Sequence, residues 1–288
     1  MKWEGRAGSD NVEDRRGQGG RRLGLPLGGG IGGIVLLLVI SALTGQNPID
    51  LLGTLGGDAG VGIDQSLGTD ETGVPPANDA QSQFIRVMLK DTEDAWSEIF
   101  ARQQATYEPP VLVLFTQATQ SGCGLGESAM GPFYCPTDRK VYLDLSFFQE
   151  LDQRFGAPGD FAQAYVLAHE VGHHVQTLTG LSERVTAARR GSSEAEANAL
   201  SVRQELQADC YAGVWGRYAA ERGLLQPGDA EAGLRAAAAI GDDRLQQQTQ
   251  GRVVPESFTH GSSDARVMWL RRGLDSGRMD ACDTFAGR

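Results

Sequence analysis

The chain has little positive charge and very few histidines. Its 288 residues include 26 Lys and Arg against 37 Asp and Glu, so the formal net charge is -11. This deficit argues against the basic surface that a nucleic-acid partner requires. Only 4 histidines are present, and all but one of them lie between residues 169 and 174. No internal repeat is visible, and the length suits one domain of about 200 residues with extensions.

One long segment lacks charge altogether. Leu23 to Thr44 contains no Asp, Glu, Lys or Arg, and such a run can cross the ~30 Å hydrocarbon core of a bilayer. The alternatives are a buried core helix, which would carry a polar stripe, and a cleaved signal peptide, which usually has a shorter leader and a shorter apolar stretch. We therefore expect a retained transmembrane helix.

Positive charge is missing again after this run, because no Lys or Arg follows Arg22 until Arg86. The positive-inside rule then predicts a single-pass membrane protein with a cytoplasmic N-terminus and a periplasmic or extracellular main domain. The linker is rich in Gly, Asp, Thr, Pro and Asn and has no aromatic residue, as flexible tethers do. The expected divisions are a basic cytoplasmic tail (1–22), the transmembrane helix (23–44), the flexible linker (45–79) and a globular domain (80–288).

Within the globular domain, the apolar pattern changes between helical and strand spacing. Asp160 is the expected N-cap of the helix that follows it, and Ser262 or Ser263 that of the last helix. The pattern predicts an α+β fold, mainly helical with a small β-sheet. Helices are expected at 80–103, 145–155, 161–178, 193–218, 230–248 and 265–273, and strands at 111–115, 133–135 and 140–144.

Cysteine is scarce, and no two cysteines have the C-x-x-C spacing of a cysteine zinc site. An even number in a domain outside the cytoplasm favours disulfides. Cys123 and Cys135 lie within one loop and are the preferred pair, which leaves Cys210 with Cys282. Alternatively, Cys210 is a plain buried thiol.

Two of the histidines form a His-Glu-x-x-His motif at 169–173, which is typical of zinc proteases, and a third, His174, follows it directly. His169 and His173 are four residues apart on an expected helix, so both project from one face, one turn apart. Two imidazoles at this separation can bind one tetrahedral zinc ion. Glu170 lies to the side of the pair and can reach a zinc-bound water without being a ligand. The alternative is a helix with surface histidines, and His174 is expected to point away from the metal.

Glu205 and Asp209 form a second pair four residues apart, downstream of the histidines. A catalytic zinc ion needs three protein ligands and one open position, and Glu205 is the expected third ligand. Asp209, one turn further on, is expected to accept the free ring N–H of a zinc-bound histidine. The apolar neighbours of this pair indicate a buried helix, in which an unpaired carboxylate would be costly. The subclass with a third histidine is excluded, because Gln176 and Thr179 occupy the two positions that it reserves for Gly and His.

The remaining histidine, His260, lies in a loop before the last expected helix. It either donates a hydrogen bond to the developing oxyanion of a hydrolysis reaction or stabilises the loop, and both interpretations stay open.

These motifs together resemble those of the bacterial neutral zinc metallopeptidase family and, by ligand pattern, the broader gluzincin group. The similarity covers roughly residues 80–285. It implies a membrane-anchored zinc peptidase with helices against a small sheet, Zn²⁺ as cofactor and a peptide or protein as substrate. The matching stretches are His-Glu-Val-Gly-His-His at 169–174, Glu-Leu-Gln-Ala-Asp-Cys at 205–210, Phe-Thr-His-Gly-Ser-Ser at 258–263 and Gly-Pro-Phe-Tyr-Cys-Pro at 131–136.

The expected reaction is metal-assisted peptide hydrolysis, with zinc on His169, His173 and Glu205, and with Glu170 as the general base. The segment 129–134 is a candidate for a sheet edge that pairs with extended substrate, an ordinary hairpin being the alternative. Two other functions remain open. One is a catalytically inactive, zinc-stabilised and membrane-tethered binding or scaffold protein, and the other is a zinc hydrolase acting on a non-peptide amide.

Overall fold

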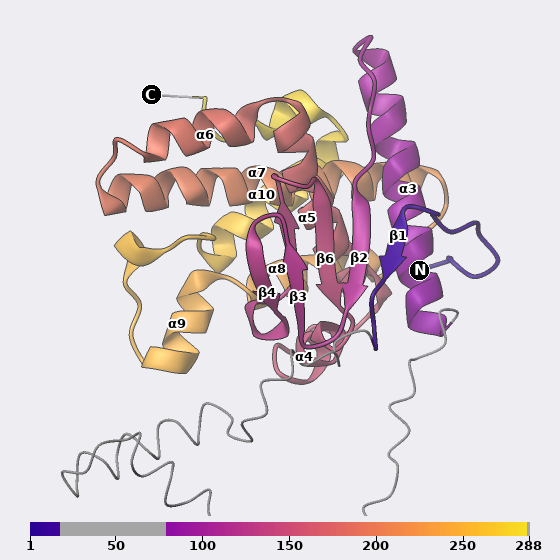
Figure 1. Cartoon of the computed structure of the whole chain (residues 1–288), viewed down its shortest axis with the longest axis horizontal. Helices are drawn as coiled ribbons and strands as arrows, with labels where there is room; N and C mark the ends of the chain where they lie inside the picture. Colours follow the sequence, from indigo (N-terminus) through magenta and orange to yellow (C-terminus); the bar gives the residue numbers. More distant parts are fainter. Residues whose placement is uncertain (18–78, 287–288) are drawn as a thin grey trace, which may run out of the picture. The chain divides into compact units, whose positions relative to one another are not determined.

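A four-stranded sheet packs against long helices in the computed structural model (Figure 1), which describes residues 1–17 and 79–286. β1 (Val12–Asp14) runs parallel to β2 (Val111–Phe115), and β2 runs parallel to β6 (Lys140–Asp144). β5 (Phe133–Cys135) is antiparallel to β6. Parallel neighbours need long connections, so this order brings distant segments of the chain together. The strands lie in the order β1, β2, β6 and β5.

The continuous apolar sequence of β2 reflects burial on both faces of the sheet. Leu112 and Leu114 belong to the main core, which the helices complete. Val113 and Phe115 face the other side and pack in a smaller apolar cluster with Tyr142. A strand with only one covered face would have alternated polar and apolar residues.

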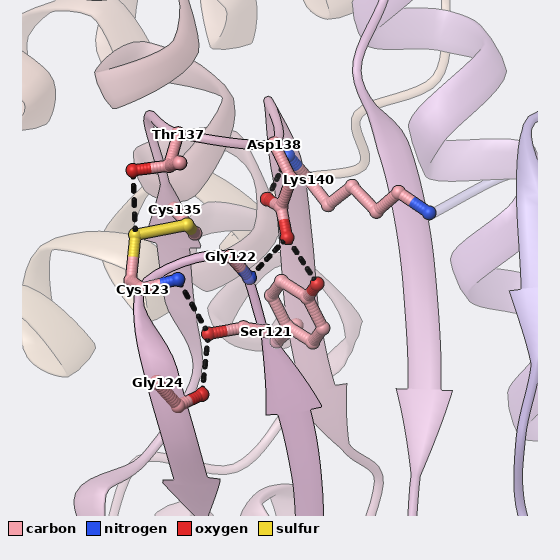
Figure 2. Close-up of a disulfide and its surroundings, with 9 residues drawn as sticks. Ser121, Gly122, Cys123, Gly124, Cys135, Thr137, Asp138 and Lys140 are labelled. Atoms are coloured by element: carbon pink, nitrogen blue, oxygen red, sulfur yellow. Dashed lines mark hydrogen bonds between the residues drawn. A yellow bond between two sulfur atoms is a disulfide. The ribbon is translucent and has the colours of Figure 1, made fainter.

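A short hairpin forms a second sheet and is fastened to β5. It consists of β3 (Ala118–Ser121) and β4 (Gly124–Glu127), followed by the 3-10 turn η1 (Ser128–Met130). Gly126 makes room for an aromatic ring, because a Cβ there would lie 2.4 Å from Cζ of Phe133. A disulfide joins Cys123 at the hairpin turn to Cys135 at the end of β5 (Figure 2).

The helices that cover the sheet begin at residues that the local sequence favours. Asp79 caps α3 (Ala80–Arg102) by accepting a hydrogen bond from the Ser82 backbone N–H at 2.7 Å. The apolar stripe of α3, which includes Met88 and Trp96, lies in the main core. The short α4 (Phe147–Gln153) follows β6, and α5 (Asp160–Leu178) runs through the centre of the molecule (Figure 1).

The C-terminal half is a layer of helices built around α7 (Glu194–Glu221). A capping box at Ser193 starts this helix. It packs against α10 (Ser263–Ser276) so closely that a Cβ on Gly273 would lie 2.0 Å from the Cys210 carbonyl oxygen. A disulfide from Cys210 to Cys282 fixes the same region. The other elements are α6 (Leu181–Arg189), α8 (Asp229–Ala239), α9 (Asp242–Gln250), η2 (Pro255–Ser257) and η3 (Met279–Cys282).

The expected mainly helical domain with a small sheet is present, but the membrane part of the prediction is wrong. Among residues 1–17 and 79–286, no helix is long and apolar enough to cross a bilayer. The expected span (23–44) and nearly all of the expected linker lie outside the described residues.

The N-terminal residues contradict the predicted localisation directly. Instead of forming a separate cytoplasmic tail, they supply β1, which pairs with β2 of the main domain. Ser9 also donates a hydrogen bond to the buried Glu93 at 2.6 Å. Strands of one sheet cannot lie on opposite sides of a membrane. The single-pass topology with a cytoplasmic N-terminus and an extracytoplasmic catalytic domain is therefore wrong.

Two local expectations also need correction. Gly159 precedes α5 as its N-cap, and Asp160 is its first residue, whose carboxylate accepts a hydrogen bond from the Trp3 indole at 3.2 Å. The helix expected over 230–248 is broken into α8 and α9. The break lies at Gly241, where a Cβ would stand 2.4 Å from the Ser263 backbone nitrogen, so α10 approaches too closely for a continuous helix with side chains.

Candidate metal centre

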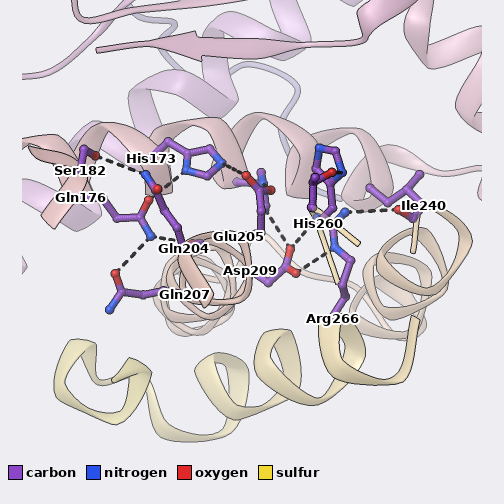
Figure 3. Close-up of polar contacts among 12 residues, drawn as sticks. His173, Gln176, Ser182, Gln204, Glu205, Gln207, Asp209, Ile240, His260 and Arg266 are labelled. Atoms are coloured by element: carbon purple, nitrogen blue, oxygen red, sulfur yellow. Dashed lines mark hydrogen bonds and ion pairs between the residues drawn. The ribbon is translucent and has the colours of Figure 1, made fainter. Parts of the chain in front are cut away.

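Two imidazoles and one carboxylate meet between α5 and α7. His169 and His173 lie one turn apart on α5, and Glu205 faces them from α7, as Figure 3 shows for His173. One carboxylate oxygen of Glu205 lies 3.1 Å from Nε2 of His169, and the other lies 3.3 Å from Nε2 of His173. The sequence expectation that these three side chains converge therefore agrees with the geometry.

A glycine allows the two helices to approach at the level of this site. A Cβ on Gly172 would lie 3.0 Å from the carbonyl oxygen of Ala208. Gly172 lies between the two histidines in sequence, and Ala208 lies between Glu205 and Asp209. A side chain at residue 172 would therefore make a tight contact with α7 at the level of the site.

The spacing of the three side chains fits a zinc ion. Tetrahedral zinc with bonds of about 2.0–2.2 Å holds its ligand atoms roughly 3.3–3.5 Å apart. The two separations between histidine and glutamate, 3.1 and 3.3 Å, are close to this value. One ligand atom from each residue lies within 4.8 Å of the others, and the described part of the chain contains no second such group of His, Cys, Asp or Glu.

The outer nitrogen of each imidazole has its own acceptor. Nδ1 of His169 lies 2.9 Å from Asp209, and Nδ1 of His173 lies 2.9 Å from the side-chain oxygen of Gln176. Donation of both Nδ1–H groups leaves each Nε2 lone pair free to face a metal. Asp209 is where the sequence predicted it. Gln176 was missed, because a glutamine in the last turns of a helix carries no signal of its own.

Asp209 is fully buried and accepts more than the histidine bond. The Tyr165 hydroxyl donates to it at 2.6 Å. The Arg266 guanidinium donates to it at 2.9 and 3.0 Å (Figure 3). Burial raises the pKa of the Asp209 carboxyl, but Arg266 and His169 outweigh burial and hold this pKa below its usual value. Sequence reasoning missed both Tyr165, whose apolar ring fits a core helix, and Arg266, which is distant from the motif in the chain.

The electrostatics of the site favour a positive charge between the three side chains. Burial lowers the pKa of His169, but the carboxylates of Asp209 and Glu205 outweigh it and raise this pKa to about 10. The pKa of His173 is also raised, because Glu205 outweighs burial. Burial raises the pKa of Glu205, but the two imidazoles hold it well below its ordinary value. Without a metal ion the site attracts protons, and a divalent cation can replace them.

Glu170 is buried next to the two imidazoles and does not join their cluster. Its side chain has no carboxylate oxygen in the group of ligand atoms. Burial raises the pKa of its carboxyl more than His169 and His173 lower it. A carboxylate with a raised pKa beside a cation site is suited to accept and return a proton near neutral pH.

His174 points away from the metal centre, as expected, and links α5 to β5. Its Nε2 lies 2.6 Å from the Glu108 carbonyl oxygen, to which it donates, and its Nδ1 accepts from the Tyr134 hydroxyl at 3.1 Å. Burial lowers its pKa to about 4, so it is neutral at pH 7. His174, which follows the motif, is therefore a structural contact between α5 and β5.

His260 is held in its loop by Asp242, a residue that sequence reasoning missed. One oxygen of Asp242 accepts the backbone N–H groups of Thr259, His260 and Gly261 at 2.8, 2.6 and 2.9 Å. The other oxygen lies 3.2 Å from Nδ1 of His260. The bond to Asp242 raises the pKa of His260 against the effect of burial, and the charge of Glu205 contributes, which puts His260 within electrostatic reach of the metal centre. Its side chain is 53% exposed.

Comparison with known proteins agrees with this geometry. Residues 1–285 match the model of a family described as "Putative neutral zinc metallopeptidase". The chain belongs to this family. Zinc is the cofactor that membership of this family implies.

Two relatives show how far the similarity extends. The uncharacterized protein YpfJ of Escherichia coli strain K12 is 50% identical over 289 residues, which cover 99% of each chain. The uncharacterized protein Rv2575 of Mycobacterium tuberculosis strain H37Rv is 41% identical over 216 residues, covering 71% of this chain and 72% of its own. No solved structure matches the chain.

Proposed function

We propose that the chain hydrolyses peptide bonds in peptides or proteins and that zinc is bound by His169, His173 and Glu205. The single observation that supports this best is the convergence of these three side chains from two helices, with separations of 3.1 and 3.3 Å between the carboxylate and the imidazoles. Hydrolysis also needs a carboxylate that is not a metal ligand, such as that of Glu170, whereas a scaffold role does not.

The chemistry divides between the metal ion and the protein side chains. Zinc bound there lowers the pKa of a coordinated water and polarises the scissile carbonyl. Glu170 accepts the proton of the attacking water and returns it to the leaving amine. Burial raises the pKa of the Glu170 carboxyl, which makes it a stronger base than an exposed glutamate. Asp209 and Gln176 hold the two imidazoles in the orientation and tautomer that metal binding needs.

His260 is our candidate for stabilising the oxyanion of the reaction. Asp242 accepts from its Nδ1 and from its backbone N–H, which leaves the other ring nitrogen as the available donor. The raised pKa of His260 favours a protonated ring, and a charged donor stabilises developing negative charge more strongly than a neutral one.

The edge strand β5 is the proposed binding site for the substrate backbone. Within the described residues it pairs only with β6, so its other edge has no strand partner and offers backbone groups to an extended peptide. The hydrogen bond of Tyr134 to His174 ties this strand to the helix that carries the metal ligands.

The first prediction tests the base. Glu170→Gln keeps the size of the side chain but cannot accept a proton, so hydrolysis should fall by about 10²–10⁴-fold while zinc content is unchanged. Cleavage of a denatured generic protein, with and without chelator, measures the activity, and metal analysis measures the zinc. Glu221→Gln, at an exposed ion pair on α7, is the control and should retain full activity. Hydrolysis by a zinc-loaded Glu170→Gln protein would contradict the assignment.

A further inference from the structure

The buried Arg266 bridges two parts of the site that are separate in sequence. Its side chain, in the first turn of α10, is 3% exposed. Nε and Nη2 donate to the two oxygens of Asp209 at 2.9 and 3.0 Å, so the contact is bidentate. The third nitrogen, Nη1, donates to the Ile240 carbonyl oxygen at 3.3 Å (Figure 3).

The contact of Arg266 with Asp209 affects the orientation of His169, a proposed zinc ligand. Asp209 receives Nδ1–H of His169, and a bidentate guanidinium fixes the plane of the carboxylate to which that imidazole bonds. Tyr165 strengthens the same arrangement, because its hydroxyl donates to Asp209 at 2.6 Å and accepts from Arg266 at 3.2 Å. The orientation of His169 thus depends on a side chain that does not touch it.

The contact of Arg266 with Ile240 affects the position of Asp242, which holds the loop of His260. Ile240 is the C-cap of α8, where carbonyl groups have no partner within the helix. Arg266 satisfies this carbonyl two residues before Asp242. Asp242 in turn holds the backbone of Thr259, His260 and Gly261 through one carboxylate oxygen. The position of that oxygen depends on where α8 ends.

We infer that Arg266 is a positioning residue that sets the metal ligands and His260 relative to each other through its contacts with Asp209 and Ile240. This inference adds a specific residue to the proposed function and rests on it for the roles of His169 and His260. A buried guanidinium is suited to this task, because it offers donors in fixed directions to a carboxylate and a carbonyl at once.

Three substitutions separate the two contacts. Arg266→Met removes both. Arg266→Lys keeps a positive charge for Asp209, but a single ammonium cannot also reproduce the bond to Ile240. Tyr165→Phe removes the hydroxyl contacts with Asp209 and Arg266, keeps the packing of the ring and leaves the contact with Ile240 in place. It remains informative if Arg266→Met fails to fold.

The chain supplies a matched control elsewhere. Arg222 donates to both oxygens of Asp91 at 2.7 and 3.1 Å and to the Asp91 carbonyl oxygen at 3.2 Å. It therefore binds a carboxylate and a carbonyl as Arg266 does, but at the C-terminal end of α7, with Trp215 as the other donor to Asp91. Arg222→Met should lower stability without changing the site.

Two measurements on the full chain test the inference without using hydrolysis. Zinc affinity is obtained by competition with a chelator, and hydrogen exchange is followed at the Thr259, His260 and Gly261 amides. In Arg266→Met, the zinc dissociation constant should rise about 10–100-fold and the three amides should exchange faster than in Arg222→Met. Arg266→Lys should change zinc affinity by less than about tenfold yet show the same faster exchange. Tyr165→Phe should weaken zinc binding and leave the exchange unchanged.

The outcomes distinguish this inference from the proposed function. If Arg266→Met matches Arg222→Met in both measurements, or if only one of the two changes, Arg266 does not couple the two groups. If the unaltered chain binds zinc but cleaves no peptide, the proposed function fails while the test of Arg266 stands. Where Arg266→Met does not fold, an Arg266→Lys protein whose three amides exchange no faster than those of Arg222→Met overturns the inference.

Discussion

At the scale of single residues, the candidate metal centre buries two carboxylates beside two imidazoles, and one guanidinium balances only one of the two negative charges. Glu205 and Asp209 lie on one helix face, and Arg266 is the permanent cation that bonds to Asp209. The remaining imbalance is the reason that the pKa of His169 rises to about 10. The site is thus prepared for a cation before one binds.

The pH dependence of zinc binding follows from these pKa values. At neutral pH the metal-free chain holds an extra proton on His169, whose pKa is raised to about 10, and the pKa of His173 is also raised, because Glu205 outweighs burial. Zinc binds only the neutral imidazoles, so it must displace up to two protons and its affinity should rise as pH increases toward about 10. Calorimetric titration in two buffers of different ionisation enthalpy counts the protons. Binding without proton release at pH 7 would show that the imidazoles are already neutral.

The stability of the metal-free chain should change in the opposite sense. A raised folded-state pKa contributes stability that is fully present below the unfolded value of 6.5 and is lost as pH rises through the folded value, about 10 for His169. Urea unfolding of the zinc-free chain should therefore shift to lower urea between pH 7 and pH 10. Equal midpoints across this range would contradict the charge pairing described above.

At the scale of elements, close helix contacts at glycines position the site. Gly172 lets α7 approach α5 beside the proposed metal ligands, and Gly213 and Gly273 let α10 approach α7. The second approach carries Arg266 to Asp209. Small residues thus control the distances between the charged groups, although none of them has a side chain that takes part in the chemistry.

The glycine contacts yield a stability prediction. In Gly273→Ala the new methyl group would lie 2.0 Å from the Cys210 carbonyl oxygen, so α7 and α10 must separate, at a cost of about 1–3 kcal/mol in unfolding free energy. Gly191→Ala is the control, since its Cβ would meet nothing within 4 Å and should change stability by less than about 0.5 kcal/mol. Urea unfolding compares them, and equal midpoints would show that the contact can relax freely.

At the scale of the whole molecule, the N-terminal residues complete the domain. Trp3 packs edge-on against Phe84 at 5.4 Å between ring centroids and donates to Asp160, the first residue of the helix that carries the histidines. Arg16, which is buried, pairs with Asp14 and with Asp79, the N-cap of α3. The beginning of the chain therefore stabilises the starts of two major helices.

This integration can be tested by a single substitution. Trp3→Ala removes a partly buried indole and should lower the free energy of unfolding by about 1–3 kcal/mol, because apolar contact and one hydrogen bond are lost. Glu4→Ala, at an exposed neighbouring residue, should have almost no effect. Thermal and urea unfolding measure both variants. A Trp3→Ala protein as stable as the unaltered chain would mean that this segment does not pack on the domain in solution.

The sequence by itself determined what depends on short spacing. The four-residue intervals of His169 with His173 and of Glu205 with Asp209 put each pair on one helix face, and the apolar runs set most strands and helices, because helix and strand periods act over a few residues. The tertiary structure decided what depends on distant contacts. Pairing with β2 turned a polar N-terminal segment into a strand, and the approach of α10 broke one expected helix at Gly241. Asp209 on α7 is buried and pairs with Arg266 from α10, because a carboxylate removed from water needs a charged or hydrogen-bonding partner.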